Sequence, residues 1–321
     1  MSGRFRNPVE TFTLRSAHIV ETIRLQLSAG PERYPPRPIP FVRRGRSDFA
    51  SPPASGLRLT WLGHATTLVE IDGKSVLTDP VWSERVSPSS AFGPKRFFPP
   101  PIAAEDLPLI DAILVSHDHY DHLDMASIRR LARGRAVFVV PLGVGAHLER
   151  WGVPPERIHE LDWGEAVGVG GLEVSAAPAR HFSGRNLTNR DRTLWCSWAI
   201  AGPRHRVFYS GDSGHLDAYR RIGAERGPFD ASLMSAGAYG PTWPDVHMTP
   251  EELVRAHVDL AAGLLVPVHW GTFNLAFHAW NEPVLRAAAE AERLGVRMAV
   301  PRPGQSLEPE ALPPLDDGWW R

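Results

Sequence analysis

The sequence has little cysteine and almost no net charge. Its 321 residues include a single cysteine, Cys196, so no disulfide can form within the chain, and the apolar residues around it indicate a buried, unreactive thiol. The formal net charge is −1, which gives no general attraction to nucleic acid or to an anionic membrane. We therefore expect no nucleic-acid partner.

Long apolar runs are also missing. No stretch approaches the length of a membrane-spanning helix, and residues 1–8 lack the apolar core of a signal peptide, so we expect a cytoplasmic protein. The chain has no Gly-x-Ser-x-Gly sequence of the kind that carries a serine nucleophile. Hydrophobic residues nevertheless make up 43% of the chain, which is enough to bury a large core.

The apolar pattern predicts an opening group of strands followed by alternating strands and helices. Strands are expected at 57–62, 66–71 and 75–78, with Asp72-Gly73 as the hairpin turn between the last two. Helices are expected at 125–133, 144–151, 216–222, 250–260 and 282–294. This order suits two sheets with helices on their outer faces.

One short run holds an unusual density of polar side chains. It reads His117-Asp118-His119-Tyr120-Asp121-His122 and follows the apolar stretch 111–115. Imidazoles and carboxylates crowded into one turn would be costly to desolvate unless a cation lay among them, so the run is a candidate metal site. The alternative interpretation is a polar turn that stays in contact with solvent. Neutral imidazole and carboxylate suit zinc, with manganese or iron as alternatives.

Three further polar residues occupy similar positions downstream. His181, Asp212 and His269 each follow a short apolar run that we read as a strand, at 172–178, 206–209 and 264–268. Strand ends gather at the rim of a sheet, so we expect these side chains to converge with the histidine run. The sequence therefore predicts a metal centre assembled from several loops.

In this order and context, the residues resemble the metallo-β-lactamase superfamily of binuclear metallohydrolases. Further segments resemble its branch of N-acylphosphatidylethanolamine-hydrolysing phospholipases D: 61–66, 77–80, 93–97, 160–163 and 269–273. The likeness runs from about residue 59 to 304. It implies an α/β fold, the αββα sandwich of two mixed sheets flanked by helices, in a hydrolase domain at 57–321 after an N-terminal extension at 1–56.

The resemblance also implies a ligand set for two metal ions, expected to be Zn²⁺, with Mn²⁺ or Fe²⁺ as alternatives. One ion would be held by His117, His119 and His181, the other by Asp121, His122 and His269, with Asp212 bridging them. Two such ions share a hydroxide that acts as the nucleophile. Catalytic roles are implied for Asp121, Asp212 and His247, and orienting roles for His64 and Asp79.

Cationic and aromatic residues near these motifs are candidates for substrate binding. Lys95, Arg96 and Phe97 lie in a proline-punctuated loop, and Arg185 follows His181. Such groups suit a phosphate and an acyl chain, although ordinary loop packing explains each of them as well. Val246 stands where the animal enzymes of this branch are expected to carry glutamine, so the specificity is open.

The N-terminal extension is rich in arginine and contains one amphipathic stretch. Ile19, Val20, Ile23 and Leu27 would form one face of a helix at 15–28, followed by an extended proline-rich linker at 35–40. A basic amphipathic helix either lies on a membrane surface or packs back on its own domain. The extension is thus a candidate for peripheral membrane contact.

The leading hypothesis is a binuclear metal-dependent phosphodiesterase acting on N-acylphosphatidylethanolamine-like phospholipids. The sequence leaves open a lactonase for a phosphorylated sugar acid, which has the same general fold and a similar metal site. It also leaves open a non-catalytic, metal-containing lipid-binding protein, although a binding module has no need of a complete two-metal ligand set. A homodimer is compatible with the sequence.

Overall fold

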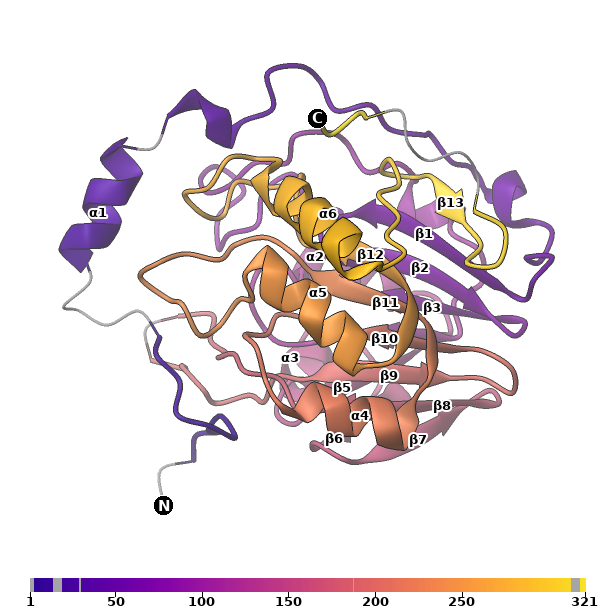
Figure 1. The fold of residues 1–321 in the computed structure, drawn as a ribbon. Helices are drawn as coiled ribbons and strands as arrows, with labels where there is room; N and C mark the ends of the chain where they lie inside the picture. Colours follow the sequence, from indigo (N-terminus) through magenta and orange to yellow (C-terminus); the bar gives the residue numbers. More distant parts are fainter. Residues whose placement is uncertain (1–2, 14–18, 29, 187, 313–317) are drawn as a thin grey trace.

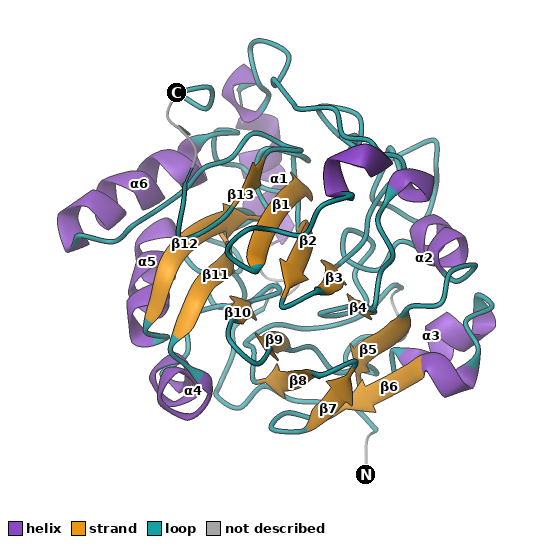
Figure 2. Cartoon of the chain, turned by 90° about the vertical axis from the view of Figure 1, so that its right-hand side faces the viewer, coloured by secondary structure: helices purple, strands orange, loops and turns teal. Residues whose placement is uncertain are grey.

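Two β-sheets packed face to face form the centre of the computed structural model, which describes residues 3–13, 19–28, 30–186, 188–312 and 318–321 (Figure 2). Among these residues, the first sheet has the strand order β13-β1-β2-β3-β4-β5-β6, with bounds Leu57–Gly63 (β1), Thr66–Ile71 (β2), Lys74–Thr78 (β3), Ala112–Leu114 (β4), Val137–Pro141 (β5), Ile158–Leu161 (β6) and Ser306–Leu307 (β13). The second has the order β12-β11-β10-β9-β8-β7, with bounds Ala166–Val169 (β7), Leu172–Ala177 (β8), Ser197–Ala201 (β9), Arg206–Tyr209 (β10), Phe229–Ser235 (β11) and Ala262–Val268 (β12). Both sheets are mixed, because β3 to β6 and β10 to β12 pair in parallel and the other neighbours are antiparallel.

Helices cover the outer faces of the two sheets. In Figure 2, α2 (Met125–Leu131) and α3 (Gly145–Arg150) lie beside the first sheet, and the second sheet is flanked by α4 (Ala218–Arg226), α5 (Pro250–Asp259) and α6 (Glu282–Leu294). The helix α1 (Ile19–Ser28) stands at the side of the molecule, away from both sheets (Figure 1). This arrangement confirms the predicted αββα sandwich.

Two apolar clusters account for the layering. The larger fills the space between the sheets and continues beneath α4, α5 and α6: it includes Leu59 and Trp61 of β1 and Trp198 of β9, and on the helix side Phe208 of β10 packs against Tyr219 of α4. The smaller joins the other face of the first sheet to Ile128 of α2 and Leu148 of α3. Because the first sheet is covered on both faces, all six residues of β2 are buried.

Local signals in the sequence explain several turns and helix ends. Asp72 and Gly73 both have positive φ, 48° and 78°, as a two-residue hairpin between β2 and β3 requires. The side chain of Thr249 accepts a hydrogen bond from Glu252 N at the start of α5, and the Glu252 carboxylate accepts one from Thr249 N, which is a capping box. The predicted helix at 216–222 is displaced to 218–226 and ends just before Gly227-Pro228, where proline has no N–H to donate.

Much of the N-terminal extension packs on the two-sheet body of the chain. Val42 N donates to Pro303 O, and Phe49 is buried in the smaller apolar cluster. In contrast, α1 exposes Val20 and Ile23, whose exposed fractions are 77% and 52%. Residues 15–18 of the predicted helix lie outside the described residues. Among the residues that are described, no helix is long and apolar enough to cross a bilayer.

Candidate metal centre

Loops at the ends of five strands bring together the predicted ligands and the predicted orienting residue His64. His64 follows β1, the histidine run follows β4, His181 follows β8, Asp212 follows β10 and His269 follows β12. His64 and His269 have φ values of 51° and 61°, in the left-handed region that non-glycine residues rarely occupy. His269 N donates to His64 O at 2.8 Å, so the two sharp turns support each other.

Three histidines form the first group of converging ring nitrogens. His119 Nδ1 lies 2.9 Å from His117 Nε2 and 3.2 Å from His181 Nε2. The His117 and His181 rings are buried, and these nitrogens are too close together for a water molecule to lie between them. A cation among the three lone pairs would relieve their mutual repulsion.

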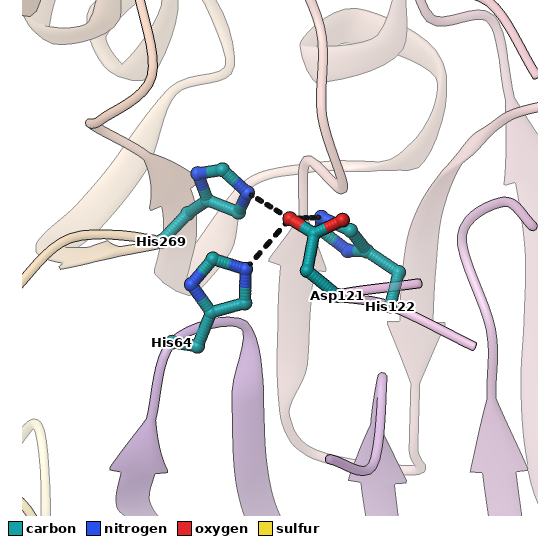
Figure 3. A group of neighbouring side chains, drawn as sticks. All are labelled: His64, Asp121, His122 and His269. Atoms are coloured by element: carbon teal, nitrogen blue, oxygen red, sulfur yellow. Dashed lines mark hydrogen bonds and ion pairs between the residues drawn. The ribbon is translucent and has the colours of Figure 1, made fainter. Parts of the chain in front are cut away.

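The second group surrounds the carboxylate of Asp121 (Figure 3). Its Oδ2 atom lies 3.0 Å from His64 Nε2, 3.2 Å from His269 Nε2 and 3.4 Å from His122 Nε2. His64 and His269 point at this oxygen from the ends of β1 and β12. The predicted orienting residue His64 therefore lies beside the ligands themselves, in direct contact with Asp121.

Asp212 lies between the two groups. Its Oδ2 atom is within 4.0 Å of ring nitrogens from five histidines: His122 at 3.1 Å, His269 at 3.2 Å, His181 and His247 at 3.9 Å, and His117 at 4.0 Å. Ser235 Oγ donates to the other oxygen, Oδ1, at 2.9 Å. The carboxylate is thus fixed at the position that a ligand shared by both groups would need.

In three of the histidines, the ring nitrogen that faces away from the cluster is hydrogen-bonded to the protein. His122 Nδ1 donates to Asp79 Oδ2 at 2.6 Å, and His181 Nδ1 donates to Val246 O at 3.0 Å. His117 Nδ1 donates to Ser116 Oγ at 2.9 Å. In each ring these bonds leave Nε2 as the lone-pair atom that faces the cluster, which is the orientation a metal ligand requires.

The donor set fits a metal ion. Within the described residues, the buried atom His247 Nδ1 has no hydrogen-bond partner and lies 3.9 Å from Asp212 Oδ2. A buried nitrogen without a partner is costly unless something else occupies its lone pair. Imidazole nitrogens and carboxylate oxygens are the ligands that zinc takes in proteins.

The charges of two of the histidines and of both carboxylates are also those of metal ligands. Burial lowers the pKa of His117 and His181 well below the ordinary histidine value. Burial alone would raise the pKa of Asp121 and Asp212, but contact with His122 holds the pKa of both carboxyls well below their usual range. Burial alone would likewise lower the pKa of His122, but the carboxylates around it raise that pKa well above its ordinary value, so without a cation this ring holds a proton that a metal ion at Nε2 would replace. The carboxylates are therefore ionised at neutral pH, as metal binding requires.

His247, the predicted catalytic histidine, is brought to the same place. Its Nδ1 atom is 3.9 Å from Asp212 Oδ2, and its ring lies 5.1 Å from that of His181, centre to centre. Burial lowers the pKa of His247 to about 4, so the ring is neutral at neutral pH. It lies close enough to the cluster to serve as a further ligand or as a proton relay.

The predicted substrate-binding residues have partners of their own. Lys95 Nζ is 2.7 Å from Glu84 Oε1 on the surface, and the Phe97 ring meets Tyr34 edge-on. Arg96 is buried, and its guanidinium lies over the Phe273 ring. Arg185 donates from Nη1 to the carbonyls of Asp118 and Leu123 at 2.8 Å and stacks on Tyr120. The structure therefore shows each of these cations with a protein partner.

Two clefts border the cluster. One of about 560 Å³ lies beside the histidine run and is lined in part by Arg85, Tyr120, Met125, Trp151 and Arg185. The other, of about 470 Å³, includes a member of the first group and is lined in part by Phe5, Val9, His181, Phe182 and Arg190. Both combine aromatic or apolar surface with charged side chains of both signs, since Glu84 and Asp124 also line the first cleft and Glu10 and Asp191 the second.

One residue at the centre was not predicted from the sequence. Tyr209, the last residue of β10, is fully buried and its hydroxyl donates to Asp79 Oδ2. Ser116 adds two hydrogen bonds to the same carboxylate, from N at 2.7 Å and from Oγ at 2.6 Å. The signal that could have found Tyr209 is its place at a strand end, three residues before Asp212.

Comparisons with known proteins agree with this geometry. Residues 74–270 match the family model described as "Beta-lactamase superfamily domain". The chain is 50% identical over 327 residues to an uncharacterised protein of Mycobacterium tuberculosis, a match that covers 99% of this chain and 86% of that one. It is 40% identical over 240 residues to N-acyl-phosphatidylethanolamine-hydrolyzing phospholipase D 1 of Caenorhabditis elegans, covering 71% of this chain and 67% of the relative.

The fold has a close counterpart among solved structures. A metallo hydrolase from the hyperthermophilic archaeon Ignicoccus hospitalis aligns with a TM-score of 0.60 and 21% identity, over 78% of this chain and 97% of that one. At this identity the likeness concerns the fold alone. Together with the family match and the histidine and aspartate cluster, it leads to one conclusion: the chain belongs to the metallo-β-lactamase superfamily, as a metal-dependent hydrolase.

Proposed function

We propose that the protein is a binuclear zinc hydrolase of phospholipase D type, acting on phosphodiester lipids of the N-acylphosphatidylethanolamine class. The observation that carries the proposal is its 40% identity over 240 residues to the C. elegans enzyme of that name. The geometry supports it, because seven side chains offer more ligand atoms than one tetrahedral ion can use.

The ligand set divides into the two groups described above. His117, His119 and His181 would hold one ion, Asp121, His122 and His269 the other, and Asp212 would contact both. Metal ions there would supply positive charge that activates water and neutralises the phosphoryl oxygens during in-line displacement. Asp79 and His64 keep His122 and Asp121 in place through the hydrogen bonds already given.

The departing alkoxide of a phosphodiester needs a proton. We propose His247 and Asp121 as relays for this proton. Both lie in the cluster: His247 Nδ1 is 3.9 Å from Asp212 Oδ2, and Asp121 Oδ2 is 3.2 Å from His269 Nε2. The reaction consumes one water molecule. The water oxygen becomes bonded to phosphorus, the P–O bond to the N-acylethanolamine breaks, and one of the two water protons passes to the leaving oxygen.

A lipid substrate also requires contact with a membrane surface, and the exposed apolar residues supply one. Val9, Val20, Ile23 and Tyr34 in the N-terminal extension and Phe92 in a loop before β4 are all at least 46% exposed. The extension is rich in arginine, and Arg24 on α1 is exposed. We propose that this surface gives the enzyme peripheral contact with anionic lipid.

A panel of substrates tests the proposal. The full chain, loaded with zinc, is assayed with N-acylphosphatidylethanolamine in mixed micelles, with bis(4-nitrophenyl) phosphate and with a phosphorylated sugar lactone. We expect phosphatidate and N-acylethanolamine from the first substrate, and ¹⁸O from labelled water in the phosphatidate. The variant Asp212→Asn is the matched control and should form neither product. Turnover of the lactone alone would refute the proposed substrate class.

A further inference from the structure

The N-terminal segment Phe5–Phe12 lies along two loops of the metal centre, far from it in sequence. Phe5 N donates to Asp191 O at 2.8 Å, and Phe12 N donates to Asp245 Oδ2 at 2.6 Å. Arg180 donates from Nη2 to Glu10 O at 2.6 Å. An extended segment cannot satisfy its own backbone groups, so these bonds to the domain hold it in place.

Asn7 makes the contact nearest to the cluster. Its Nδ2 donates to His181 O at 2.7 Å, and its Oδ1 accepts from His181 N at 3.0 Å. The same Oδ1 accepts from Trp195 Nε1 at 3.1 Å. One side-chain amide therefore holds both backbone polar groups of His181, in the way that a neighbouring strand would.

His181 is then fixed at three points. Asn7 holds its peptide groups, and Val246 O accepts from its Nδ1 at 3.0 Å. The remaining ring atom, Nε2, faces His119 Nδ1 at 3.2 Å and Asp212 Oδ2 at 3.9 Å. Fixing the backbone as well as the ring determines where the Nε2 lone pair points, which is what a metal ligand needs.

The second anchor of the segment lies on the loop that holds the other side of this histidine. Asp245 accepts from Phe12 N and forms an ion pair with Arg180 at 2.8 Å. The next residue, Val246, supplies the carbonyl bonded to His181. The segment thus joins the loop that carries His181 to the loop that carries Val246 and His247.

We propose that Asn7 is a positioning residue for the metal ligand His181, and that residues 5–12 are part of the metal centre. The inference rests on the proposed metal site. Asparagine suits the position because it offers one donor and one acceptor to the two peptide groups. An aspartate of the same size would place a second oxygen against His181 O, so the charge and the lost donor both oppose the arrangement.

The test measures metal binding by the full chain, with Asn7→Ala and the equally sized Asn7→Asp as variants. Val258→Ala is the matched control, because Val258 is an exposed apolar residue on α5, outside both the segment 5–12 and the metal centre. Zinc affinity is measured by competition with a chromogenic chelator, and cobalt-loaded protein is compared by visible absorption, which reports ligand geometry. Circular dichroism verifies that each variant is folded.

We expect both Asn7 variants to bind one of two zinc ions about 10–100-fold more weakly, to keep the other, and to change the cobalt spectrum. The Val258→Ala variant should behave like the unaltered chain. If the unaltered chain binds two ions and both Asn7 variants match it, the role of Asn7 is refuted while the proposed function stands. If the unaltered chain binds no metal, the proposed function fails and the role of Asn7 fails with it.

Discussion

Replacing Asp79 by asparagine removes a buried charge without changing the volume of the side chain. Asp79 Oδ1 accepts from Ser116 N at 2.7 Å, and Oδ2 accepts from His122 Nδ1 at 2.6 Å. The hydroxyls of Ser116 and Tyr209 also donate to Oδ2. The backbone of Asp79 has a φ of 32°, which asparagine tolerates well, so the substitution acts mainly through these hydrogen bonds.

Whichever way the new amide turns, its NH₂ group faces an N–H donor. One orientation opposes it to Ser116 N and the other to His122 Nδ1. A buried donor left without an acceptor costs about 1–3 kcal/mol, so we expect a loss of that size in the free energy of unfolding. If His122 instead moves its proton to Nε2, that nitrogen can no longer bind metal, and zinc affinity should fall about 10–100-fold.

Urea unfolding of the metal-free protein and zinc competition measure the two effects. Tyr209→Phe is the matched control, because it removes one of three donors to Oδ2 and leaves the carboxylate and His122 in contact. We expect it to lose about 1 kcal/mol or less. An Asp79→Asn protein with unaltered zinc affinity and an unaltered urea midpoint would refute the idea that Asp79 orients His122.

Three further changes test other parts of the molecule. Asp212→Asn should abolish turnover while circular dichroism stays unchanged, since it removes a charge between the two ligand groups and no core volume. Replacing both Val20 and Ile23 by serine should weaken sedimentation with anionic vesicles and lower activity on vesicle-borne substrate, but not on a short soluble phosphodiester; equal loss on both would refute the membrane role. Burial lowers the pKa of His257 to about 4, below the unfolded value of about 6.5. The folded chain therefore binds fewer protons than the unfolded chain between these two values, and its free energy of unfolding decreases as the pH falls from 6.5 to 4. Unfolding of a His257→Leu variant should therefore depend less steeply on pH across that window, by up to about 3 kcal/mol, and an unchanged slope would contradict this.

The layered fold and the place of the cluster could be predicted because they depend on local patterns. Apolar runs predict strands, and polar residues directly after them predict a shared rim, so His117, Asp212 and His269 were expected to meet. The structure brings them together, with both histidines within 4.0 Å of the Asp212 carboxylate. The resemblance to a known family supplied the pairing of ligands, which strand patterns alone do not determine.

Contacts between distant segments could not be predicted in this way. Asn7 and His181 are 174 residues apart, and no pattern in the sequence around Asn7 indicates that its side chain has a partner. The contacts of a long cationic side chain are equally hard to predict. The charge of Arg185 suggested that it binds a phosphate, whereas its guanidinium lies against Tyr120 and two backbone carbonyls. Its role in substrate binding stays a prediction.

The position of the N-terminal segment changes how the extension should be tested. Deleting residues 1–30 would remove Val20 and Ile23 of α1, but it would also remove Asn7 and so disturb His181. Loss of activity on every substrate would then be expected even if α1 binds membranes. Point substitutions on α1 separate the two roles, because Val20 and Ile23 are exposed and the contacts of Asn7 are left intact.

The same contacts link metal binding to the docking of the segment. Asn7 holds His181 in the conformation whose Nε2 faces the cluster, so an ion that binds this conformation also favours the docked segment. By linkage, whatever the docked segment adds to metal affinity, the metal adds to the stability of docking. The N-terminal extension would therefore do two things at once: residues 5–12 hold a ligand loop of the metal centre in place, while α1 exposes Val20 and Ile23 to the surroundings.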